Sequence, residues 1–142
     1  MKQSALKGKI VAAVRIRGRV NVRSSIEETM DRLNLRRVNN CAIIKVTDPY
    51  LGMLKKCVNH IAYGEVNEET LSKLVTKFNL NIDPKGLING KVDIKEIKEK
   101  MPLRLHPPRH GLKSVRRHFN QGHVAHFELT FFKCLENDQS LI

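Results

Sequence analysis

The chain has 142 residues, of which 41% are hydrophobic, and its 26 Lys and Arg against 14 Asp and Glu give a formal net charge of +12. This length predicts one domain over residues 1–142. No run of about 18 apolar residues is present, so the sequence predicts no membrane-spanning helix, and the first residues lack the apolar run of a secretory signal. The basic excess favours a polyanionic partner, either a nucleic acid or an anionic membrane surface.

The three cysteines are odd in number and widely spaced, at Cys41, Cys57 and Cys134. Disulfide frameworks belong to secreted domains with paired cysteines. We therefore expect reduced thiols and a cytoplasmic protein.

The positive charge lies in separate segments. Residues 1–23 hold seven Lys and Arg and no acid, residues 102–119 hold five and no acid, and residues 63–101 hold seven of each sign. A uniformly solvated basic surface would not segregate its charge in this way. Two basic segments around a neutral middle favour nucleic acid as the partner.

The first predicted strand covers residues 10–16, which are β-branched and apolar and then alternate. The alternation places Arg15 and Arg17 on the face opposite Val14 and Ile16. Because a covered face needs apolar side chains, we expect the two arginines on an open face of the sheet.

A helix is predicted to follow and to run to about Asn34. Ser25 and Glu28 have the spacing of a capping box, in which each side chain accepts a hydrogen bond from the other residue's backbone. Arg36 and Arg37 come directly after this helix. They can interact with the negative helix C-terminus, with phosphate, or with both.

The second strand is predicted at residues 41–47, with Asp48 as the cap and Pro49 as the first residue of a second helix. Gly64 is a typical terminator for that helix. His60 falls outside its apolar stripe and is expected on the surface. The stripe consists of Tyr50, Leu54, Cys57, Val58 and Ile61.

Residues 65–101 form a neutral, amphipathic insert, with helices capped by Asn67 and Asp93. Residues 102–106 are predicted as the last strand, after which Pro107 and Pro108 begin a basic arm and C-terminal extension over residues 107–142. Within this extension the segment after Gly122 is ambiguous between helix and strand, with helix favoured.

This order predicts an α+β fold whose core spans residues 9–64. A three-stranded antiparallel sheet would carry two helices on one face, with the helical insert placed before the last strand. The other face would carry Arg15, Arg17 and Arg104 and would form an RNA-binding platform.

Six motifs, in order along residues 10–109, resemble the L thirty family of large-subunit ribosomal proteins in its archaeal long form, which is similar to eukaryotic L seven. They are Arg15-Ile-Arg-Gly18, Val38-Asn-Asn-Cys41, Thr47-Asp-Pro-Tyr50, Gly52-Met53, Tyr63-Gly64-Glu65 and Leu103-Arg-Leu-His-Pro-Pro-Arg109. The sequence departs from the family at His110-Gly111, where relatives tend to carry two glycines.

The resemblance implies a ferredoxin-like β-α-β-α-β core in the large ribosomal subunit. It implies a structural protein that binds 23S ribosomal RNA near the 5S RNA region, beside neighbouring ribosomal proteins, and supports assembly and translation. It implies no catalysis, cofactor, metal, membrane or small-molecule substrate. Charge and matched motifs together give the expected RNA contacts as Arg15, Arg17, Arg19, Arg23, Arg36, Arg37, Arg104, His106, Arg109, Lys113, Arg116 and Arg117.

An enzymatic alternative starts from the loop between Gly18 and Arg23, which is similar to the phosphate-cradling loop of acylphosphatases. There Arg23 would hold an acyl phosphate through paired hydrogen bonds. That loop needs a second glycine where this chain has Val22. The surroundings of Asn39 and Asn40 do not match the motif of the asparagine that orients water in such enzymes.

Two further alternatives are a metal site and a protein-interaction module. Zinc sites of this spacing usually include a Cys-x₂₋₄-Cys pair, which the sequence lacks. The module would act through the neutral insert at residues 65–101 alone. The residues of the possible metal cluster are His106, His110, His118, His123, His126 and Cys134.

Overall fold

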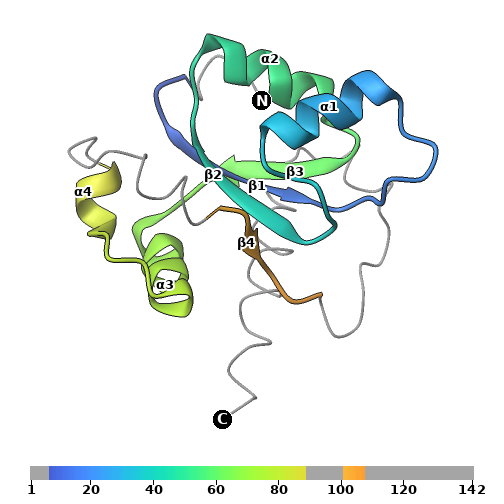
Figure 1. Cartoon of the computed structure of the whole chain (residues 1–142). Helices are drawn as coiled ribbons and strands as arrows, with labels where there is room; N and C mark the ends of the chain where they lie inside the picture. Colours follow the sequence, from blue (N-terminus) through green and yellow to red (C-terminus); the bar gives the residue numbers. More distant parts are fainter. Residues whose placement is uncertain (1–6, 89–100, 108–142) are drawn as a thin grey trace.

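The computed structural model describes residues 7–88 and 101–107 (Figure 1). The elements are β1 (Ile10–Arg15), α1 (Ser24–Arg32), β2 (Asn40–Lys45), α2 (Asp48–Lys56), β3 (Ile61–Glu65), α3 (Glu68–Phe78), α4 (Pro84–Ile88) and β4 (Leu103–Arg104). Helices and strands interleave along the chain and the strands are antiparallel, so the predicted α+β class and antiparallel sheet are confirmed.

The described residues form a four-stranded sheet in the order β3-β1-β2-β4. The apolar β1 lies inside it, with Val14 opposite Cys41 of β2 and Arg15 opposite Ile61 of β3. The edge strand β4 is short and places Leu103 opposite Cys41.

The predicted three-stranded sheet is wrong because it lacked β3. The sequence pattern predicts that the second helix continues to Gly64, since Ile61 lies four residues after Cys57 and prolongs a helical stripe. In the structure α2 ends at Lys56, and a turn brings the His60 amide to the Cys57 carbonyl at 2.9 Å. Residues 61–65 then gain a full ladder of hydrogen bonds with β1, which a longer helix would forfeit.

Both faces of the sheet are covered, so the predicted open RNA-binding face is also wrong. The helices α1 and α2 lie together on one face, as predicted, but they cover Val11 and Ala13 of β1, on the face that was expected to be open. Ala12 and Val14 point the other way, into a core that includes Leu74 of α3. Figure 1 shows α3 on the side of the sheet opposite α1 and α2. The insert thus completes a second core.

The starts of the helices differ from the predicted caps. α1 begins at Ser24 rather than after Ser25, and no side-chain cap bond forms; the Ser25 carbonyl instead accepts a hydrogen bond from the Thr29 hydroxyl at 2.8 Å. α2 starts at Asp48 with Pro49 in its first turn, close to the prediction. The helix predicted after Asp93 and the C-terminal extension from residue 108 lie outside the described residues.

Candidate nucleic-acid interface

The antiparallel topology brings four separate segments to one end of the sheet. β1 ends there, β2 and β3 begin there, and β4 ends there. We call the segments 16–23, 33–39, 57–60 and 104–107 the loop end. Backbone hydrogen bonds join them: the Ile16 amide donates to the His60 carbonyl at 3.0 Å, and the Leu105 amide donates to the Asn39 carbonyl at 2.9 Å.

Three asparagines allow the loop end to turn tightly. Asn21, Asn34 and Asn39 have φ values of 58°, 60° and 65°, in the left-handed region. Asparagine enters this region more readily than other residues with a Cβ atom. The turns at Asn34 and Asn39 reverse the chain between α1 and β2 within a few residues.

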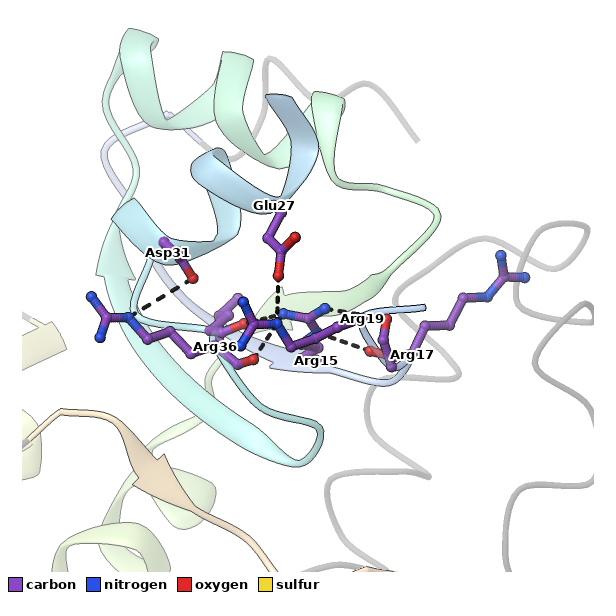
Figure 2. A network of polar contacts seen from close by, with 8 residues as sticks. Arg15, Arg17, Arg19, Glu27, Asp31 and Arg36 are labelled. Carbon is purple, nitrogen blue, oxygen red and sulfur yellow. Dashed lines mark hydrogen bonds and ion pairs between the residues drawn. The ribbon is translucent and has the colours of Figure 1, made fainter. Parts of the chain in front are cut away.

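Arg15 connects two loops of the loop end from inside the protein. Its side chain is fully buried on the α1–α2 side of the sheet (Figure 2). Its Nε donates to the Arg17 carbonyl at 2.8 Å and its Nη2 to the Gly18 carbonyl at 3.2 Å. Its Nη1 donates to the carbonyls of Leu35 at 2.9 Å and Arg36 at 3.0 Å. One guanidinium therefore fixes the backbone of two loops to each other.

This geometry corrects the prediction that Arg15 contacts RNA. The predicted alternation with Val14 was right, but the face it shares with Val11 is the one that α1 and α2 cover. Burial lowers the pKa of the Arg15 guanidinium, and the nearby Glu27 carboxylate acts in the opposite direction. Arginine remains protonated in proteins, so the buried group keeps its charge and its five N–H donors.

The other predicted arginines of the described residues lie on the outside of the loop end. Arg19 pairs with Glu27, and Arg36 lies 3.8 Å from Asp31. Arg17 points away from the Arg15 network in Figure 2. Within residues 7–88 and 101–107, no carboxylate forms an ion pair with Arg17, Arg23, Arg37 or Arg104.

His60 is a candidate residue that the sequence pattern does not predict. It was expected on the surface of a helix, but it lies half-buried in the turn before β3, with its Nδ1 atom buried and without a hydrogen-bond partner among the described residues. Burial lowers the pKa of His60, and the charges of Arg17 and Arg15 lower it further. No periodicity marks such a turn residue.

An open pocket of about 330 Å³ lies beside His60. Its other walls come from one loop, residues 17–22 of the β1–α1 connection. Val20 stands at this loop with 86% of its surface exposed. The lining residues are Arg17, Gly18, Val20, Asn21, Val22 and His60.

The remaining predicted contacts follow β4. Arg104 and His106 are exposed at the loop end, whereas Arg109, Lys113, Arg116 and Arg117 lie outside the described residues. Among residues 7–88 and 101–107, no three His, Cys, Asp or Glu side chains gather as metal ligands; the rest of the predicted histidine cluster is outside them. Over the same part of the chain, each helix is too short or too polar to cross a bilayer.

Comparisons with known proteins agree on one family. The family model described as Ribosomal protein L30p/L7e matches residues 11–61, from β1 to the start of β3. The large ribosomal subunit protein uL30 of Methanocorpusculum labreanum is 35% identical over 133 residues, which cover 78% of this chain and 87% of the relative.

Two further uL30 proteins, from other archaea, show a similar identity. That of Archaeoglobus fulgidus is 32% identical over 137 residues, covering 81% of this chain and 90% of the relative. That of Nanoarchaeum equitans is 36% identical over 135 residues, covering 80% and 87%. Identity at this level over most of both chains shows common membership. The chain therefore belongs to the uL30 family of large ribosomal subunit proteins, a family of structural, non-enzymatic proteins.

Proposed function

We propose that this chain binds large-subunit ribosomal RNA through the loop end of its sheet, holding 23S RNA near the 5S RNA region and supporting subunit assembly and translation. It rests on the chain's membership of the uL30 family and on the RNA binding expected from its motifs. The order β-α-β-α-β over residues 10–65 supports the ferredoxin-like core which that expectation includes.

The observation that carries the proposal is the set of arginines at the loop end. Arg17, Arg23, Arg37 and Arg104 come from three segments and have no ion-pair partner among the described residues. Guanidinium groups donate paired hydrogen bonds to phosphate oxygens. Contacts of this kind position a protein on RNA by the shape of the backbone.

Arg15 strengthens the proposal because it orders the loops before RNA arrives. Four carbonyls of the two arginine-bearing loops accept hydrogen bonds from its side chain. Loops that are already fixed lose less conformational entropy on binding, so more of the contact energy appears as affinity.

The basic arm begins at the proposed interface. The β4 strand ends at the loop end, where the Leu105 amide donates to the Asn39 carbonyl. The chain therefore enters the segment after Pro107 from the proposed interface. We include in the RNA-binding surface the arm residues Arg109, Lys113, Arg116 and Arg117.

The packing of the insert supports this assignment, because buried apolar side chains of α3 and α4 belong to the protein's own core. Leu71 and Leu74 of α3 and Leu87 of α4 are buried against the sheet. They are not available as a docking surface without disrupting the core. The outward faces of α3 and α4 remain for neighbouring ribosomal proteins.

A salt series on two matched double variants tests the proposal. Arg37→Gln with Arg104→Gln removes two charges from the loop end. Lys45→Gln with Lys85→Gln removes two from the far end of β2 and from α4, where both lysines are exposed. Affinity for deproteinised large-subunit RNA is measured at increasing salt concentration.

We expect the loop-end double variant to weaken binding and to lower the slope of log affinity against log salt by about two, because two phosphates of the RNA are no longer neutralised by the protein. The control variant should keep the wild-type slope. Equal slopes for the two variants would contradict the loop end as the binding surface.

A further inference from the structure

The pocket beside His60 differs in chemistry from the rest of the loop end. Arg17 contributes a charged residue to its lining, whereas Val20 and Val22 are apolar and Asn21 is polar. Its volume of about 330 Å³ is at the low end of the range for small-ligand clefts, roughly 300–1,000 Å³. An RNA duplex is too wide to enter such a pocket, but a single nucleotide is of suitable size.

The His60 ring is suited to an uncharged role in this pocket. Its Nδ1 atom is shielded from solvent and accepts no hydrogen bond from the described residues. Burial and the two neighbouring arginines lower its pKa, so the neutral imidazole dominates at neutral pH. A neutral ring offers a flat face for stacking rather than a second positive charge beside Arg17.

The backbone that carries the ring is also held in place. The His60 carbonyl accepts a hydrogen bond from the Ile16 amide, and the His60 amide donates to the Cys57 carbonyl. Arg15 holds the opposite wall through the carbonyls of Arg17 and Gly18. Hydrogen bonds therefore hold the backbone on both sides of the pocket.

We propose that this pocket holds one unpaired nucleotide of the RNA, with its base stacked on the His60 ring between the valine side chains and its phosphate bound by Arg17. Single-stranded bases are commonly recognised in this way, by an aromatic face together with nearby cations. The proposal rests on the proposed RNA-binding function and adds a structural selectivity to it: the loop end should prefer RNA with an extruded base over uninterrupted duplex.

The test uses two RNA hairpins with the same stem, one fully paired and one with a single bulged 2-aminopurine, whose fluorescence reports stacking. Affinities of the full chain are measured for both. The variants are His60→Leu, which removes the ring, and His60→Phe, which keeps a stacking face at the same position and serves as the matched control. Thermal unfolding and the salt slope check that each variant is folded and retains its phosphate contacts.

Wild type should bind the bulged hairpin about 5-fold to 100-fold more tightly than the paired one, the effect of one stacked base. His60→Leu should lose this preference at an unchanged salt slope, while His60→Phe keeps it. Equal wild-type affinity for the two hairpins, or a preference that survives His60→Leu, would overturn the pocket proposal. Failure of wild type to bind either hairpin or large-subunit RNA would instead overturn the RNA-binding function beneath it.

Discussion

Replacing Arg15 with methionine tests whether Arg15 stabilises the fold from inside or contacts RNA directly. Methionine is similar in length and apolar, so Arg15→Met fills most of the space but donates no hydrogen bonds. The carbonyl of Leu35 would lose a buried partner, and those of Arg17, Gly18 and Arg36 would lose partly buried ones.

The expected loss of stability follows from these four bonds. A hydrogen bond from a charged donor contributes about 1.5–3 kcal/mol and an ordinary one about 0.5–1.5 kcal/mol. The buried bond to Leu35, taken at the first value, and three partly buried bonds at the low end of the second give about 3–5 kcal/mol. The desolvation of the guanidinium, which methionine avoids, offsets part of this. We expect the free energy of unfolding to fall by about 2–4 kcal/mol, a large share of the total of about 5–15 kcal/mol for a typical domain.

Urea unfolding and RNA affinity, measured on the same variants, provide the assay. Arg37→Met, at an exposed arginine of the same end, should change stability by less than about 0.5 kcal/mol but weaken RNA binding directly. Arg15→Met should weaken RNA binding only as the loops lose their order, together with stability. A variant of Arg15 that loses RNA affinity at wild-type stability would refute the internal role.

Three further predictions concern other parts of the described structure. The pKa of His60 is lower in the folded protein than in the unfolded chain. As the pH falls below about 6.5, the unfolded chain therefore binds a proton at His60 before the folded protein does. The stability that the neutral ring contributes is present above this pH and is lost on acidification; His60→Gln should flatten that decline in urea midpoints between about pH 5 and pH 7. Leu74→Ala should lower the free energy of unfolding by about 2–4 kcal/mol, because Leu74 is fully buried in the second core, whereas Thr76→Ala, at an exposed site, should change it by less than about 0.5 kcal/mol. Burial raises the pKa of the Cys57 thiol, and Cys41 is also buried, so alkylation followed by mass spectrometry should modify both only in the unfolded chain; rapid native modification of either would contradict the packing.

Hydrophobic periodicity predicted β1, β2 and the helices that follow them, because each segment is long enough to show one clear period. The strand β3 lacked such a signal. Ile61 fits both the end of an α2 stripe and the start of a short strand, and Gly64 fits a helix terminator. Residues 61–65 form a strand and not a longer helix because they pair with β1. This interaction joins residues far apart in sequence, so no local pattern contains it.

The errors about the candidate site share a cause. The alternation around Arg15 and Arg17 could not show that α1 and α2 cover the face of Arg15 while α3 covers the other face. His60 was missed because its place beside residues 17–22 arises from the β1–β3 pairing, while positive φ at Asn21 could have been suspected from the preference of asparagine for left-handed turns.

Hydrogen–deuterium exchange of the full chain, with and without deproteinised large-subunit RNA, tests the central claim most directly. Binding at the loop end should slow amide exchange in residues 16–23, 33–39 and 57–60 and leave the exposed turns around α3 and α4 unchanged. Protection confined to α3, α4 and the α2 surface, with residues 16–23 and 33–39 exchanging as in the free protein, would contradict the loop end as the RNA-binding surface.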